Sequence, residues 1–157
     1  MTSTNTSPPP PSDVAHDWRK HGLRYFAYRF NLRRRMGFQV RRISLDAGFT
    51  CPNVVGSVAI GGCTFCDNRS FSPSRRLGRR SIAEQLDQGI QRVSSRYACE
   101  HFMAYFQPAT NTYGPVDRLR QLYEEALSHP QVVALAIGTR PDCVPNEVLD
   151  LLSELAE

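Results

Sequence analysis

The chain has 157 residues, of which 41% are apolar and 22% charged, and its formal net charge is +4. This composition is ordinary for one globular domain. No apolar run approaches the roughly 18 residues that span a bilayer, and the first residues lack the basic and apolar regions of a secretory signal. Five cysteines, three of them close together, are not typical of a secreted disulfide framework. The sequence therefore predicts a cytoplasmic protein that does not enter a membrane.

The chain begins with two segments of unusual composition. Residues 1–12 combine Ser, Thr and Asn with four consecutive prolines, so they have little to bury and are predicted to be a disordered tail. Residues 13–37 interleave aromatic side chains with Lys and Arg. Their partly helical spacing predicts a basic, aromatic helical segment, which Gly37 ends.

Charge is distributed unevenly along the chain. From Trp18 to Leu45 there are nine Lys and Arg residues and no acids, whereas Glu100 to Glu157 holds nine acids and only three Arg. Two interpretations of the basic stretch stay open. It could contact a polyanion such as RNA, or it could be a solvated helix face.

The rest of the chain, residues 38–157, alternates strand and helix patterns. Residues 38–45 alternate apolar and polar side chains and predict a strand, from whose end the cysteine-containing loop follows. Ser81 and Glu84 form a capping box that starts a helix. The predicted core stripe of this helix is Ile82, Leu86, Ile90, Val93 and Tyr97.

Two further strand and helix pairs follow. Residues 101–107 predict a strand, and Pro115 starts a helix with Leu119, Leu122, Tyr123, Ala126 and Leu127 on its core side. Residues 132–137 are continuously apolar, as expected for a buried parallel strand. Asn146 opens a last helix with Val148, Leu149, Leu152 and Leu155 on its core side.

The order of elements predicts an α/β fold with a parallel sheet and right-handed crossovers. The chain ends in a running helical pattern without a Gly or Asn stop signal. We therefore expect a fragment, or a chain whose remaining half comes from a partner.

Three cysteines, Cys51, Cys63 and Cys66, share one Gly-rich loop with the spacing C-x11-C-x2-C. Three thiolates from one loop suit an iron–sulfur cluster that leaves one iron free of protein ligands. Structural zinc usually takes four ligands in two close pairs, and only one close pair exists here. Cys99 and Cys143 lie outside the loop and are not predicted ligands. The alternative is a structural zinc site in a nucleic-acid-binding module.

The Cys loop, with Phe65 before its last cysteine, resembles that of the radical S-adenosylmethionine (radical SAM) superfamily. Within the superfamily the chain resembles the YhcC/YtqA-like branch, and its cysteine spacing is similar to that of elongator-type tRNA-modifying proteins. Residues 105–107 (YFQ), 110–113 (TNTY) and 138–144 (GTRPDCV) agree with this branch. Residues 52–56 depart from it because they lack an Arg-Asp pair before the glycine, so we expect different polar contacts around the cysteines.

The resemblance implies a fold and two cofactors. Residues 38–157 would form the amino-terminal half of a partial (βα)6 barrel, with a [4Fe–4S] cluster on Cys51, Cys63 and Cys66. The free iron would bind S-adenosylmethionine, and an electron from an external donor would cleave it to methionine and a 5′-deoxyadenosyl radical. The substrate stays open, with RNA as one possibility.

The resemblance also implies residues that contact the cofactor. Gln107, Thr110 and Asn111 follow the second strand, where the superfamily holds the methionine ammonium, and each has the alternative role of a turn residue. Arg140 is a candidate for binding a carboxylate or ribose group, with an Arg140–Asp142 ion pair as the alternative. Phe65 would shield the cluster, contact the adenine or pack in the core.

Overall fold

The computed structural model describes residues 14–67 and 80–157, so the predicted tail at residues 1–12 lies outside the described residues. The described residues up to Gln39 belong to one compact unit, and Val40–Glu157 to another. Within these ranges no helix has both the length and the apolar character needed to cross a membrane.

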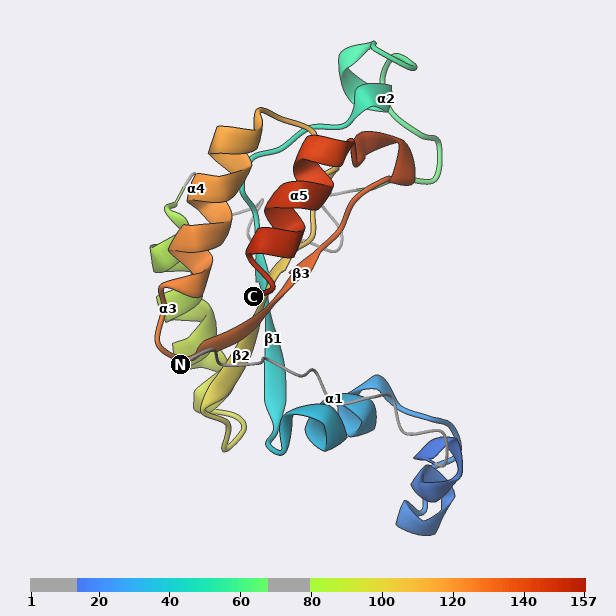
Figure 1. Cartoon of the computed structure of the whole chain (residues 1–157), viewed down its shortest axis with the longest axis vertical. Helices are drawn as coiled ribbons and strands as arrows, with labels where there is room; N and C mark the ends of the chain where they lie inside the picture. The colour runs from blue at the N-terminus through green and yellow to red at the C-terminus, as the bar shows by residue number, and fades with distance from the viewer. Residues whose placement is uncertain (1–13, 68–79) are drawn as a thin grey trace, which may run out of the picture. The chain divides into compact units, whose positions relative to one another are not determined.

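Three parallel strands form the sheet of the second unit: β1 (Val40–Leu45), β2 (His101–Phe106) and β3 (Val132–Ile137). Their spatial order is β1-β2-β3 (Figure 1). The last residues of the strands, Leu45, Phe106 and Ile137, are paired side by side. The prediction of an α/β fold with a parallel sheet is thus confirmed. The loops after all three strands begin at the same end of the sheet, where the carboxyl ends of the strands lie side by side.

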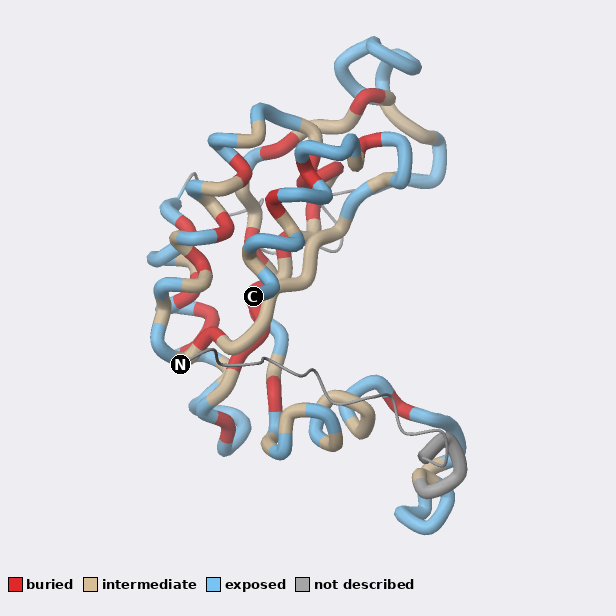
Figure 2. The backbone as a smooth tube through the Cα atoms, in the orientation of Figure 1, coloured by how far each residue is buried: buried red, intermediate tan, exposed pale blue. Residues whose placement is uncertain are grey.

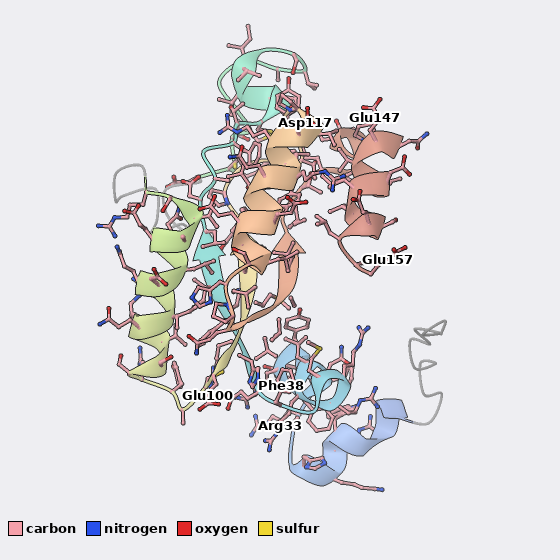
Figure 3. The ribbon with its side chains drawn as sticks, turned by 60° about the vertical axis from the view of Figure 1, so that its left-hand side comes forward. Arg33, Phe38, Glu100, Asp117, Glu147 and Glu157 are labelled. Atoms are coloured by element: carbon pink, nitrogen blue, oxygen red, sulfur yellow. The ribbon has the colours of Figure 1, made fainter. Side chains whose placement is uncertain are left out.

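The helices α3 (Ile82–Ser94), α4 (Val116–Leu127) and α5 (Asn146–Glu154) lie along one side of this sheet (Figure 1). Helix α3 packs on β1, α4 packs on β3 and on α3, and α5 packs on α4. Figure 2 shows buried residues on the strands and on the helix faces turned toward them. Asp117 and Glu147 in the first turns of α4 and α5 (Figure 3) place carboxylates where the helix dipole favours them.

The predicted capping box starts α3. The Ser81 hydroxyl accepts a hydrogen bond from the Glu84 backbone N–H at 3.1 Å, and the Ser81 N–H donates to the Glu84 carboxylate at 2.9 Å. Ile82, Leu86 and Ile90 are buried as predicted. The prediction for Tyr97 is wrong, because α3 ends at Ser94 and Tyr97 is exposed, with the Arg41 guanidinium 4.1 Å from its ring centroid.

Two predictions about the last strand and helix need correction. In β3 only Val132 is buried and the other five residues are half-buried, because no further strand pairs with β3 in the described part of the chain. In α5 the buried residues are Val148 and Leu151, whereas Leu149 is 49% exposed. Leu152 and Leu155 are partly buried and pack against the core, so the core side of α5 is formed by Val148, Leu151, Leu152 and Leu155.

The first unit contains the 3-10 helix η1 (Val14–His21) and the helix α1 (Tyr28–Met36). The predicted helical segment is therefore interrupted, and Gly22 follows η1 in the left-handed conformation with φ of 69°. Its predicted end at Gly37 is confirmed, because Gly37 has φ of 81° and its N–H donates to the Arg33 carbonyl at 2.9 Å.

Candidate functional site

The Cys loop follows β1 and includes the short helix α2 (Pro52–Val55), with Cys51 at its N-cap. Asn53 contacts two of the three predicted ligands. Its backbone N–H donates to Cys51, and its side-chain Nδ2 donates to the Cys63 sulfur at 3.0 Å. Residues 52–56 lack the Arg-Asp pair of the resembled branch, but Asn53 within them makes polar contacts with two of the cysteines.

The loop folds back on α2 to bring Cys63 near its first turn. The Gly62 N–H donates to the Asn53 carbonyl at 2.8 Å, and Val55 and Ile60 form an antiparallel bridge. The loop glycines all have positive φ, which lets the backbone bend where other residues would be strained: Gly48, Gly56, Gly61 and Gly62.

The Cys51 thiol is also contacted from the ends of the other two strands. The Thr110 side chain, which follows β2, hydrogen-bonds to Cys51. Arg140, which follows β3, has its Nη1 atom 4.0 Å from the Cys51 sulfur. Burial by itself raises the pKa of Cys51, but these hydrogen bonds and the positive charge of Arg140 outweigh it and lower the pKa below the ordinary value of a cysteine.

The turn after β2 is held in a strained conformation. Ala109 has φ of 65°, a left-handed conformation that costs a residue other than glycine roughly 1–2 kcal/mol. The following residue, Thr110, is buried and donates its N–H to the Thr50 carbonyl at 3.1 Å. This conformation of Ala109 turns the chain so that Thr110 contacts both Thr50 and Cys51.

Asn111 is fully buried and joins the ends of β2 and β3. Its Nδ2 donates to the Phe106 carbonyl at 3.1 Å and to the Gly138 carbonyl at 2.8 Å. Its backbone carbonyl accepts a hydrogen bond from the Tyr123 hydroxyl at 2.7 Å. The Asn111 Oδ1 atom is buried and finds no donor among the described residues. Asn111 therefore acts as a turn residue and retains one unused acceptor.

Thr112 strengthens the same junction. It is buried, and its hydroxyl hydrogen-bonds to the Thr139 hydroxyl and to the Cys143 carbonyl. The loops after β2 and β3 are therefore fixed to each other by buried polar contacts. Such satisfied contacts hold the side chains that project from these loops in defined positions.

Arg140 pairs with Asp142, as the alternative interpretation predicted. Two hydrogen bonds of 2.9 and 2.7 Å join the guanidinium to the two carboxylate oxygens. The pair raises the pKa of Arg140 and lowers that of Asp142. Because the same guanidinium also reaches Cys51, the ion pair fixes a positive charge beside the candidate ligand.

Gln107 lies beside the sheet and does not contact the cysteines through any described hydrogen bond. Its Oε1 accepts from the Ser44 hydroxyl at 3.2 Å. Next to this contact, the guanidinium of Arg42 in β1 lies 4.7 Å from the ring centroid of Tyr105 in β2. Sequence analysis missed the contacts of Ser44 and Arg42, although their alternate positions in β1 place them on one face of the sheet.

The remaining cysteines and Phe65 differ in burial and in their place relative to the site. Cys66 is exposed, and in the described residues no three His, Cys, Asp or Glu side chains gather closely enough to hold a metal ion. Phe65 is 89% exposed, so the expectation that it packs in the core is wrong. Cys99 is buried before β2, at the opposite end of the sheet, and its thiol donates to the His101 carbonyl at 3.2 Å. Cys143 is buried as well, and burial raises its pKa.

The chain is similar to part of several longer proteins. It is 45% identical to Protein YhcC of Escherichia coli (strain K12) over 124 residues, which are 79% of this chain and 39% of that protein. It is 39% identical to Uncharacterized protein YtqA of Bacillus subtilis (strain 168) over 134 residues, which are 85% of this chain and 42% of that protein. The chain thus spans about two fifths of the length of these relatives. No family model and no solved structure matches it.

Proposed function

We propose that this chain is part of a radical SAM protein in which Cys51, Cys63 and Cys66 hold a [4Fe–4S] cluster. One observation carries the proposal: the loops after all three parallel strands converge on the Cys51 thiol. Ligands of α/β proteins bind at the carboxyl ends of the strands, which is the edge where these loops lie. In this proposal the three strands are the first units of a partial (βα)6 barrel.

The chemistry of the donor set fits a cluster. Thiolates, not thiols, bind iron, and hydrogen bonds to sulfur tune such sites. Asn53 donates to the Cys63 sulfur, while Thr110 and Arg140 contact the Cys51 sulfur. Cys66 is the third ligand, and its N–H is already bonded to the Cys63 carbonyl at 3.0 Å. Because metal binding is coupled to folding, Cys51, Cys63 and Cys66 would come closer together when they hold the cluster.

A cluster with one iron free of protein ligands supplies reductive cleavage of S-adenosylmethionine to methionine and a 5′-deoxyadenosyl radical, with the electron from an external donor. The role of the protein's own residues is to hold the cluster and to position S-adenosylmethionine beside it. Arg140 neutralises negative charge beside Cys51. The unused Asn111 Oδ1 is an acceptor of the kind that an ammonium group needs. Thr110 holds the Cys51 side chain in place.

The test is anaerobic reconstitution with iron and sulfide, followed by metal analysis and absorption spectroscopy. We expect a brown protein with about four irons per chain, as for one [4Fe–4S] cluster. Cys51→Ala, Cys63→Ala and Cys66→Ala should each lose the iron. Cys99→Ala and Cys143→Ala are the matched controls and should keep it, because both residues lie outside the loop.

Two results would overturn the proposal. Iron loss in Cys99→Ala with a folded protein would show that the ligand set is wrong. A colourless protein that binds one zinc ion would instead support the structural zinc site of the alternative interpretation. A second readout is S-adenosylmethionine itself, which should change the electron paramagnetic resonance signal of the reduced cluster.

A further inference from the structure

The first unit carries a concentrated positive charge. Between Trp18 and Gln39 there is no Asp or Glu, and there are seven basic residues: Arg19, Lys20, Arg24, Arg29, Arg33, Arg34 and Arg35. The last three lie in the final turn of α1, where the helix dipole favours cations. The dipole does not account for the other four, which precede α1 or lie in its first turn. Helix stabilisation therefore explains only part of the charge.

Exposed aromatic rings lie among these cations. Tyr25 is 71% exposed and Tyr28 61% exposed, and Phe26 is also exposed. Arg29 and Arg33 are exposed one helical turn apart on α1, and Figure 3 shows Arg33 on this helix. The segment thus presents large rings and guanidinium groups together at the surface, which is unusual because aromatic side chains are normally buried.

The segment has its own ring contacts, which connect η1 to α1. The rings of His21 and Phe30 are 5.1 Å apart between centroids, and those of Phe26 and Phe30 are 6.0 Å apart in an edge-to-face arrangement. Such pairs contribute about 0.5–1.5 kcal/mol each beyond their burial. These rings explain the packing of the segment, and the Tyr25 and Tyr28 rings lie exposed at its surface.

We propose that the surface formed by Tyr25, Tyr28, Arg29, Arg33 and Arg35 binds single-stranded nucleic acid. Sequence-tolerant binding of single strands combines cations that contact the phosphates with aromatic rings on which the bases stack. A duplex offers phosphates but keeps its bases stacked inside, so it would leave the rings unused. The surface has both parts of the recognition, and both are exposed.

An anionic membrane is the competing partner for a basic helix. A helix that lies in a membrane interface needs one broad apolar face opposite its charges. Helix α1 lacks such a face, since Arg residues occupy four of its nine positions and their spacing places them on several sides of the helix. The distribution of charge on α1 therefore favours a nucleic acid over a membrane surface. Binding to an anionic membrane is one of the outcomes that the test distinguishes.

The test measures binding of fluorescein-labelled U20 RNA and dT20 DNA by fluorescence anisotropy, with the full chain and without added metal. Affinity should fall steeply between 50 and 200 mM salt, because each neutralised phosphate of a single strand contributes roughly −0.7 to the slope of log K against log salt. The triple variant Arg29→Gln/Arg33→Gln/Arg35→Gln should lower that slope by about 2. Arg92→Gln, an exposed arginine on α3, is the matched control and should leave it unchanged.

The stacking contribution is tested at Tyr25, whose exposure makes it tolerant of replacement. Tyr25→Leu should weaken binding roughly fivefold or more, as expected for the loss of one stacked base, whereas Tyr25→Phe should bind like the original chain. Circular dichroism of each variant verifies that the fold is kept.

Three outcomes would overturn the inference. The first is the absence of binding at low salt, and the second is binding that the triple variant leaves unchanged. The third is co-sedimentation with phosphatidylcholine vesicles containing phosphatidylserine, lost in the triple variant, when no RNA or DNA binds. Because the assay uses protein without a cluster, failure of the proposed iron–sulfur function would leave this inference standing, and the reverse also holds.

Discussion

Cys51 is the residue at which the ends of all three strands meet. Its thiol is contacted by Thr110 after β2 and by Arg140 after β3, and Asn53 contacts it from its own loop. Cys143 has the opposite environment, because burial and the neighbouring Asp142 carboxylate raise its pKa. The two thiols therefore differ in the pH at which they ionise, although both lie near Arg140.

This difference predicts a difference in reactivity. Thiolates react with iodoacetamide and thiols do not, so a lowered pKa means that Cys51 becomes reactive at lower pH than an ordinary cysteine. Arg140→Gln removes a hydrogen bond and a positive charge that favour the thiolate, so the pH midpoint of Cys51 alkylation should rise. The measurement is alkylation rate against pH in the metal-free protein, followed by mass spectrometry of the cysteine peptides.

A control variant and the Cys143 thiol provide two comparisons for this prediction. Arg118→Gln is a matched control, because Arg118 hydrogen-bonds to the Ala47 carbonyl at 3.4 Å and has no described contact with Cys51. It should leave the midpoint unchanged. An unchanged midpoint in Arg140→Gln, or a Cys143 midpoint below that of Cys51, would contradict the account of this site.

At the scale of elements, the contact between α3 and β1 depends on a missing side chain. Gly89 lies in the middle of α3 and is buried. A Cβ atom placed there would lie closer to the Cγ2 methyl of Ile43 than non-bonded carbon atoms approach. Ile43 is itself buried in β1 and β-branched, so its Cγ2 cannot turn away cheaply. The glycine therefore allows the helix to approach the sheet.

Gly89→Ala sets two effects against each other. Alanine improves helix propensity by about 1 kcal/mol, whereas an extra carbon in a packed core typically costs about 1–3 kcal/mol. We expect the packing cost to win, with a net loss of about 1 kcal/mol in the free energy of unfolding. For a chain of this size that loss lowers Tm by roughly 2–4 °C.

Thermal unfolding followed by circular dichroism measures the change. Gln91→Ala on the exposed side of α3 is the matched control and should alter Tm little. If Gly89→Ala raised Tm, the helix would have to pack less closely on β1 than described here.

At the scale of the whole molecule, no strand of residues 14–67 and 80–157 pairs with the outer side of β3, so the described sheet has an open edge there. β3 lies at the end of the strand order, its residues are all apolar, and five of the six are only half-buried. An edge strand presents unpaired N–H and C=O groups that can pair with another chain. Leu149 on α5 adds an exposed apolar side chain.

We therefore expect this chain to self-associate at micromolar concentration through β3. Ala136→Lys places a charge on the edge strand and should weaken association at least tenfold, because charged residues block edge pairing. Gln121→Lys, at an exposed position of α4, adds the same charge elsewhere and should not. Analytical ultracentrifugation over a concentration series distinguishes these cases. A monomeric chain at 100 µM would refute the expectation.

The sequence by itself determined the three strands and the helices α3, α4 and α5 of the second unit and their order. The capping box at Ser81 and Glu84 predicted the start of α3, Pro115 predicted the start of α4, and the apolar run of residues 132–137 predicted the position of β3 but not its half-burial. These signals are local: they depend on hydrogen bonds within one turn or on the side-chain period of one element. The three cysteines were candidates for the same reason, since spacing within one loop is a local property.

Only the tertiary structure decided which residues surround Cys51. Thr110 and Arg140 are 59 and 89 positions away from it, and their contact depends on the parallel register that aligns the strand ends. Likewise, Leu151 rather than Leu149 faces the core because of the way α5 packs on α4. Half-burial of β3 depends on which elements lie beside it. Long-range contacts of this kind have no signature in local sequence, because burial and pairing belong to the assembled sheet and not to any one segment.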